Sequence, residues 1–234
     1  MELIAHRSGP VKYPEQTILS ARQALKDGAD YVEIDVRLTA DGEIAISHDD
    51  NANRIFGIDK LVSKMSRTEF LSLRHVKHPA FPAHLLDHYF ACRIAPLLIH
   101  IKERAVLEPL LNAIDRCGYQ KQVVLGVQEP DWAEVVKRHN PDFLILAFMQ
   151  APGKVDAFAD AGADIIRLWE SWVSKDAVKT VKDRGKKVWV MAGACNGFDV
   201  GYTSNERLRQ FLNNDVDGVL LNDIRSFQKA IEAF

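Results

Sequence analysis

Short apolar runs alternate with helical patterns along almost the whole of this 234-residue chain. Parallel strands need a crossover between them, usually a helix, so this alternation is typical of parallel βα units. Eight such units in a chain of this length predict an α/β fold, a TIM (β/α)8 barrel, as a single domain over residues 1–234. A doubly wound sheet stays open as an alternative, because periodicity does not show whether a sheet closes. The expected strands are 3–6, 31–36, 96–101, 122–127, 143–147, 164–168, 187–191 and 218–221, and the expected helices are 16–27, 105–117, 131–139, 154–161, 175–184, 205–213 and 224–234.

One segment, about residues 50–95, breaks this rhythm and has no clear βα pattern. It follows the second expected strand and a short run at 43–47 that we expect to be a further strand leading to His48. Loops of this length in a compact domain usually have a function. We therefore expect a small insertion that covers the mouth of the barrel and influences which substrate enters.

The bulk composition narrows the possible classes of protein. A net charge of −2 gives no basic surface for nucleic acid, and no run of about 18 apolar residues predicts a membrane span. We expect no signal peptide before the first strand. The three cysteines have no metal-type spacing and cannot all pair internally, so we expect reduced thiols in a cytoplasmic protein.

The carboxylates Glu33 and Asp35 lie two residues apart in the second expected strand. Side chains alternate between the faces of a strand, so both carboxylates point the same way and the apolar residues beside them point the other. Two adjacent carboxylates repel each other and are costly to bury, and a divalent cation such as Mg²⁺ or Ca²⁺ relieves both problems. The pair predicts a metal site, with a solvated face on an edge strand as the alternative.

Two histidines and an arginine lie near this pair in the sequence, where strand-like runs end. In a barrel, the carboxyl ends of the strands form the functional face. His6 and His48 could therefore face each other across a substrate and act as general acid and base. Arg7 carries a planar guanidinium that matches phosphate oxygens. The alternatives are hydrogen-bonded structural histidines and a surface ion pair of the arginine.

Five motifs follow one another in the first fifty residues: His-Arg-Ser-Gly at 6–9, Pro-Glu-Gln-Thr at 14–17, Gly-Ala-Asp-Tyr-Val-Glu-Ile-Asp-Val at 28–36, Thr-Ala-Asp-Gly at 39–42 and His-Asp at 48–49. Their order resembles the pattern of the glycerophosphodiester phosphodiesterase family. That pattern reads His-Arg-Gly, Pro-Glu-Asn-Thr, Gly-Ala-Asp-x-Ile-Glu-x-Asp-Val, Thr-x-Asp-Gly and His-Asp. The resemblance implies a TIM barrel in which His6 and His48 are the acid/base residues. It also supports phosphate binding by Arg7.

The third expected strand departs from the family pattern at one position. The family reads Glu-x-Lys, and this chain reads His100-Ile101-Lys102. The resemblance assigns the glutamate position to a third metal ligand beside Glu33 and Asp35, and Lys102 to phosphate binding. Mg²⁺, Ca²⁺ or Mn²⁺ are the expected metals, and the neutral imidazole of His100 shifts the preference toward Mn²⁺, Co²⁺ or Zn²⁺. The alternative is that His100 only fills space and metal binding is weak or absent.

Two further positions take their roles from the resemblance. Glu15 corresponds to an active-site glutamate that holds its neighbours in place, although a charge at a helix N-terminus would explain it equally. Trp189 corresponds to a tryptophan that lines the substrate pocket. The asparagine that the family carries three residues later is replaced by Ala192. We also expect Trp169 and Trp172 either to wall the mouth or to pack under a loop.

The resemblance implies an enzyme that hydrolyses small-molecule glycerophosphodiesters to an alcohol and glycerol 3-phosphate, as part of lipid and glycerol metabolism. The sequence leaves the alcohol, the metal and the oligomeric state open. One alternative is a degenerate barrel that binds a phosphorylated ligand with little turnover, as the changes at His100 and Ala192 would suggest. The other is a phospholipid phosphodiesterase similar to the sphingomyelinase D proteins. Those proteins are secreted and disulfide-bonded, which this sequence does not predict for itself.

Overall fold

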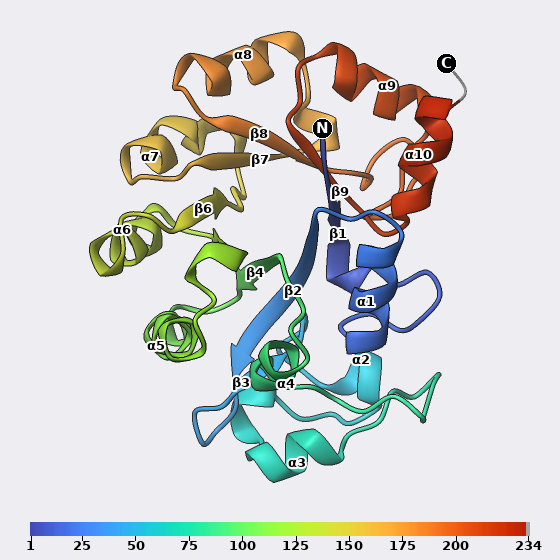
Figure 1. Ribbon diagram of the computed structural model, residues 1–234, viewed down its shortest axis with the longest axis vertical. Helices are drawn as coiled ribbons and strands as arrows, with labels where there is room; N and C mark the ends of the chain where they lie inside the picture. Colours follow the sequence, from blue (N-terminus) through green and yellow to red (C-terminus); the bar gives the residue numbers. More distant parts are fainter. Residues whose placement is uncertain (233–234) are drawn as a thin grey trace.

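Eight parallel strands close into a barrel in the computed structural model, which describes residues 1–232 (Figure 1). The strands are β1 (Glu2–Ala5), β2 (Tyr31–Leu38), β4 (Leu97–Ile101), β5 (Val123–Val127), β6 (Leu144–Ala147), β7 (Ile165–Trp169), β8 (Lys187–Met191) and β9 (Gly218–Leu221). Each pairs with the next in this order, and β1 pairs with β9 to complete the ring. The TIM barrel is confirmed, and the doubly wound sheet is excluded by this closure. The short strand β3 (Ile44–Ile46) lies antiparallel against β2.

Helices surround the barrel between successive strands. They are α1 (Ile18–Lys26), α4 (Leu86–Ala91), α5 (Leu107–Cys117), α6 (Pro130–His139), α7 (Val155–Asp160), α8 (Lys175–Asp183), α9 (Asn205–Asn213) and α10 (Ile224–Glu232). Thr17, Ser174 and Ser204 start their helices by accepting a backbone N–H with the side-chain oxygen. All seven expected helices are present, and the last two residues of the one expected at 224–234 lie outside the described part. No helix among the described residues is long and apolar enough to cross a membrane.

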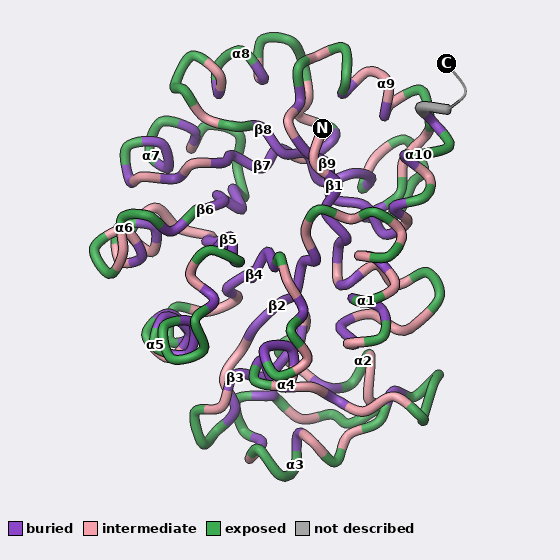
Figure 2. The backbone as a smooth tube through the Cα atoms, viewed as in Figure 1, coloured by how far each residue is buried: buried purple, intermediate pink, exposed green. Residues whose placement is uncertain are grey.

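The barrel buries its apolar residues in two places. Outward-facing strand residues pack against the inner faces of the helices and form the main core, seen as buried strands inside exposed helix surfaces in Figure 2. Inward-facing residues form a smaller cluster low in the barrel: Ile4, Leu98, Val124, Leu146, Phe148, Ile165, Trp189, Met191 and Leu220. Nearer the carboxyl ends of the strands most inward-facing residues are polar, so these strand ends surround a polar cavity.

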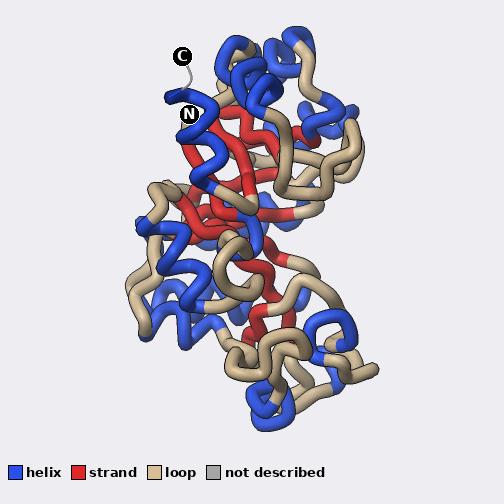
Figure 3. Tube along the Cα trace, turned by 90° about the vertical axis from the view of Figure 1, so that its right-hand side faces the viewer, coloured by secondary structure: helices blue, strands red, loops and turns tan. Residues whose placement is uncertain are grey.

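The segment at 50–95 divides into two parts. Helices α2 (Asn53–Phe56) and α3 (Arg67–Ser72) belong to an irregular region with a small core of its own, at the lower end of the molecule in Figures 1 and 3. Helix α4, by contrast, places Leu86, Tyr89 and Phe90 in the main core. The last ten or so residues of this segment therefore belong to the barrel wall, and the inserted part ends before α4.

Because the inserted region has a separate core, we predict that its packing can be lost without unfolding the barrel. Phe70→Ala removes a fully buried ring from the small core, at a cost of about 3–5 kcal/mol. Amide hydrogen exchange should then accelerate in residues 52–84 while the barrel strands keep their protection. Phe158→Ala, which removes an equally buried ring from the main core, is the matched control and should lower protection throughout. Equal effects of the two variants would show that the inserted region and the barrel unfold together.

Candidate active site

A cavity of about 500 Å³ opens at the carboxyl ends of the barrel strands. Most of its walls come from inward-facing residues near the strand ends, and many of these are polar or charged. The lining residues are His6, Arg7, Glu33, Asp35, Arg37, His48, His100, Lys102, Gln128, Phe148, Gln150, Arg167, Trp169, Met191 and Val200. Seven residues assigned to the site from the sequence thus meet in one cavity, although they come from four separate stretches of the chain.

Glu33, Asp35 and His100 form a buried polar cluster in this cavity. Each offers a ligand atom, and these atoms lie within 4.8 Å of one another. The Nδ1 atom of His100 is 2.8 Å from Oδ1 of Asp35 and 3.7 Å from Oε1 of Glu33. The two carboxylates are each only 1% exposed. Such burial of two like charges is tolerated only with compensating partners, and a divalent cation is the partner that this donor set suits.

The other oxygens of the two carboxylates are already occupied. The backbone N–H of Arg7 donates to Oε2 of Glu33 at 2.6 Å, and Gln16 donates its side-chain N–H to Oδ2 of Asp35 at 2.7 Å. Arg7 and Gln16 both have left-handed backbones, with φ of 47° and 60°, which is uncommon for residues other than glycine. These turns place the two donors at the outer oxygens, and the inner oxygens lie toward Nδ1 of His100.

The charge on Asp35 is stabilised despite its burial. Burial alone would raise the pKa of Asp35, but the hydrogen bond from His100 and the nearby charge of Lys102 more than offset this and lower it. The Nζ atom of Lys102 is 3.4 Å from Oδ1 of Asp35. Lys102 therefore lies beside the candidate metal site, where a bound phosphate would also need a positive charge.

The imidazole of His100 is held on two sides. Its ring stacks on Phe148, with centroids 3.8 Å apart and planes at 15°, and its Nε2 atom lies 3.0 Å from Nε2 of Gln128. Phe148 can lie this close because the neighbouring strand carries Gly126. A Cβ atom at Gly126 would approach the Phe148 ring to 2.4 Å. These contacts orient the Nδ1 edge of His100 toward the two carboxylates.

The two histidines proposed as acid and base each have one polar partner. Nδ1 of His6 lies 2.8 Å from Oδ1 of Asn222, and Nδ1 of His48 lies 2.7 Å from Oδ1 of Asp49. In each case the hydrogen bond uses Nδ1 and leaves Nε2 for other contacts. Burial is the main cause that lowers the pKa of both rings below the usual 6.5. Neutral imidazoles at neutral pH are suited to accept a proton.

Glu15 connects two arginines, Arg7 and Arg54. Its carboxylate is 3.5 Å from Nη1 of Arg7 and accepts two hydrogen bonds from Arg54, at 2.7 and 3.0 Å. Arg54 belongs to α2 of the inserted region and also pairs with Asp49. Glu15 thus contacts both arginines but is not among the residues that line the cavity, and its positioning role stays a prediction.

The prediction that Trp189 lines the substrate pocket is wrong. Trp189 is 0% exposed, and its indole N–H donates to Glu2 at 2.8 Å, near the amino-terminal ends of the strands. Its side chain points into the barrel, but two positions too early along β8 to reach the cavity, and Met191 reaches it instead. Of the two tryptophans after the sixth expected strand, Trp169 lines the cavity and Trp172 packs against the main core.

Sequence reasoning also missed residues that the structure brings to the site. Asn222 contacts His6 from 216 positions away, and Gln16 occupies a motif position whose side chain had no assigned role. Arg167 is an inward-facing residue of β7, and no motif singled it out. Its position between apolar residues in an expected strand was the available signal, because an arginine there must be either buried or functional.

The fold and the cavity together define a TIM barrel with a candidate divalent-metal site and cationic side chains at the carboxyl ends of its strands. The model of the glycerophosphoryl diester phosphodiesterase family matches residues 6–129, which is more than half of the chain. The chain belongs to this family.

Known relatives agree with this assignment. A glycerophosphodiester phosphodiesterase of Bacillus altitudinis is 40% identical over 68 residues, which make up 29% of this chain and only 28% of that protein. The solved structure of a glycerophosphodiester phosphodiesterase from Agrobacterium tumefaciens has a TM-score of 0.80 and 21% identity, covering 97% of this chain and 99% of that one. An Oleispira antarctica phosphodiesterase, solved with the product sn-glycerol-3-phosphate, has a TM-score of 0.81 and 19% identity, covering 99% and 97%. At these identities the structural likeness shows the fold.

We predict that His6 and His48 both titrate below pH 6.5 in the metal-free protein, because burial disfavours their charged forms. An unfolded chain would take up these protons first, so the free energy of unfolding should fall as the pH drops through about 6.5. NMR titration of the ring signals, assigned with His6→Gln and His48→Gln, measures the two pKa values. Titration of either ring above pH 6.5 would contradict the buried, neutral state.

Proposed function

We propose that this protein hydrolyses glycerophosphodiesters to an alcohol and glycerol 3-phosphate in a reaction that depends on a divalent metal ion. The observation that carries the proposal is that one cavity contains the carboxylate pair on β2, the two histidines expected to act as acid and base, and the two cations expected to bind phosphate. These residues are Glu33, Asp35, His6, His48, Arg7 and Lys102. Family membership and the ligand of the Oleispira antarctica structure support the same substrate class. Reduced thiols suit a cytoplasmic protein of lipid and glycerol metabolism, and the three cysteines are unpaired.

We assign the metal ion to Glu33, Asp35 and His100. The fit rests on the chemistry of the donor set: the buried Oδ1 atom of Asp35 lies 2.8 Å from Nδ1 of His100, and a carboxylate oxygen of Glu33 lies within 4.8 Å of both. A bound ion would neutralise phosphate charge in the transition state. When Nδ1 of His100 is a ligand, Nε2 carries the proton, and a half-turn of the Gln128 amide presents its oxygen to that N–H.

The chain's own residues supply binding and proton transfer. Lys102 and Arg7 bind the phosphate oxygens, which carry the charge that must be stabilised. One of the two histidines accepts a proton from the attacking hydroxyl, and the other donates a proton to the leaving alcohol. The family resemblance allows the attacking group to be the substrate's own glycerol hydroxyl, which gives a cyclic phosphate that water then opens.

If this assignment is right, His6→Ala and His48→Ala should each lower kcat by at least about a hundredfold, because general acid/base groups contribute about 10²–10⁴. Turnover is measured on the best substrate from a screen of glycerophosphodiesters with several divalent metals. Circular dichroism checks that both variants fold. His139→Ala, on the outer surface of α6, is the control and should keep wild-type activity. Near-normal turnover in both cavity variants would favour the alternative of a degenerate, ligand-binding barrel.

The metal assignment predicts a change of preference in His100→Glu. A third carboxylate adds a hard, charged oxygen ligand, so affinity should move from Mn²⁺, Co²⁺ or Zn²⁺ toward Mg²⁺ or Ca²⁺. Calorimetric titration of each metal into the two proteins measures this without relying on activity. His100→Ala serves as the control and should weaken binding of every metal. Metal preferences that are the same in wild type and His100→Glu would remove His100 from the site.

A further inference from the structure

Arg167 lies on the wall of the cavity opposite the candidate metal site. It is an inward-facing residue of β7, and the strand order places β7 four strands away from β2 in either direction around the ring of eight. Glu33 and Asp35 project from β2, so the arginine and the carboxylates face one cavity from opposite sides. A ligand that fills the cavity would touch both walls.

The guanidinium of Arg167 is buried without a counter-ion. The residue is 2% exposed, and no carboxylate of residues 1–230, whose side chains the structure describes, forms an ion pair with it. Nη2 donates one hydrogen bond to the carbonyl of Met149 at 3.1 Å, whereas Nε and Nη1 have no partner. Burial lowers the pKa of Arg167 to about 9. An unpaired buried cation is costly, and such groups cluster at sites where a ligand supplies the missing charge.

Aromatic rings hold this guanidinium in one place. It lies 4.3 Å from the ring centroid of Trp169 and 5.4 Å from that of Phe148. Contacts of a guanidinium with ring faces are attractive and restrict its motion. The arginine is therefore already ordered before a ligand arrives, which lowers the entropy lost on binding.

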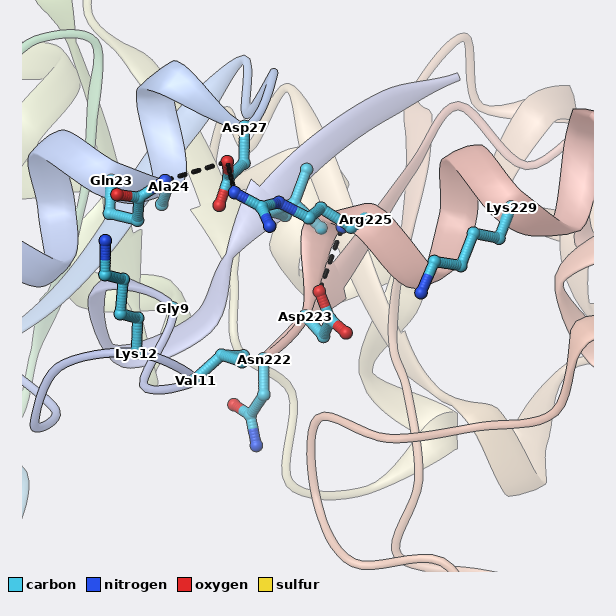
Figure 4. Close-up of a pocket in the computed structure, with 11 residues that line it drawn as sticks. Gly9, Val11, Lys12, Gln23, Ala24, Asp27, Asn222, Asp223, Arg225 and Lys229 are labelled. Carbon is cyan, nitrogen blue, oxygen red and sulfur yellow. Dashed lines mark hydrogen bonds and ion pairs between the residues drawn. The ribbon is translucent and has the colours of Figure 1, made fainter.

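Two other cations of the cavity differ from Arg167 in that a carboxylate lies nearby: Glu15 for Arg7 and Asp35 for Lys102. Arg37 donates only to a backbone carbonyl, that of His48, but it is less buried than Arg167. A second hollow, between α1 and α10, contains an arginine in a different environment (Figure 4). There Arg225 pairs with Asp27 and is largely exposed.

We infer that Arg167 binds a second anionic group on the substrate, so that preferred substrates are glycerophosphodiesters whose alcohol portion carries a phosphate or a carboxylate. This inference rests on the proposed function. The scissile phosphate belongs with Lys102 and the carboxylate pair on one wall, which leaves the opposite wall to the remainder of the substrate. The planar fork of Arg167 can bind two oxygens of either anion, and a cavity of about 500 Å³ lies in the range of small-molecule sites.

Three substrates with the same glycerophosphate half test the inference. They are glycerophosphoglycerol, its terminal phosphate ester, and glycerophosphoglycerate, which carries a carboxylate. Wild type should show a kcat/KM at least about tenfold higher for an anionic substrate than for glycerophosphoglycerol. The better of the two charged substrates identifies the anion. Arg167→Met should lower kcat/KM for that substrate by about tenfold to a hundredfold, as expected for lost charge-assisted hydrogen bonds, and leave glycerophosphoglycerol within about threefold.

Two matched variants sharpen this comparison. Arg167→Lys keeps the charge but loses the fork and should retain part of the preference. Arg225→Met removes a paired arginine from the second hollow and should retain all of it. Arg167→Met should melt at or above the wild-type temperature, because it removes an unpaired buried charge. Equal loss on all three substrates would assign Arg167 to the scissile phosphate, and no loss on any would make it structural. Either result overturns the inference.

A binding experiment separates this inference from the proposed function. Calorimetry compares glycerol 1,3-bisphosphate with glycerol 3-phosphate, and neither needs to react. Wild type should bind the bisphosphate at least about tenfold more tightly, and Arg167→Met should remove the difference. If no diester is hydrolysed but this difference is found, the proposed function fails while the second anion site stands. Equal affinities in wild type, for these ligands and for the three substrates, would overturn the anion site even in an active enzyme.

Discussion

The repulsion between Glu33 and Asp35, two carboxylates buried side by side on β2, is the constraint on which the rest of the site depends. Each outer oxygen is satisfied by a separate segment: the turn after β1 supplies a backbone N–H, and the loop before α1 supplies Gln16. The inner oxygens face His100, with Lys102 close by. Groups that follow β1, precede α1 and belong to the end of β4 thus reduce the cost of burying this pair. The cavity therefore forms around two buried charges, and only the folded barrel brings together the groups that stabilise them.

The barrel was predictable from the sequence because its signal is local and repeated. Eight apolar runs and the helical periodicity between them need no knowledge of contacts, and the structure keeps all eight strands. Closure was not predictable, since it depends on the pairing of β1 with both β2 and β9. The inserted region was located through its lack of pattern. The end of the inserted region was placed too late in the sequence. Helix α4 is only six residues long, which is too short to show a clear helical pattern.

The candidate site was predictable where motifs are contiguous and not where the contact is distant. The strand alternation that groups Glu33 with Asp35 also places Trp189 inside the barrel. Alternation gives the face of a strand but not the depth along it, and Trp189 lies one layer too deep. Asn222 comes from the last strand end and could be paired with His6 only once the barrel had closed. Arg167 belongs to no motif. Its position as a charged residue within an apolar strand nevertheless indicated that it is either buried or functional.

Phe148 has a consequence that reaches beyond packing. One ring stacks on His100 and also lies beside Arg167, so it contacts a candidate metal ligand and the unpaired arginine on the opposite wall. The ring sits tightly over Gly126, which gives it little room to adjust independently of either neighbour. If either neighbour moved, the ring would have to move with it, so the positions of His100 and Arg167 are linked through Phe148. Thermodynamic linkage requires such an effect to be reciprocal: if the metal ion strengthens anion binding across the cavity, the anion strengthens metal binding by the same factor. A single aromatic side chain thus joins the two walls of the barrel.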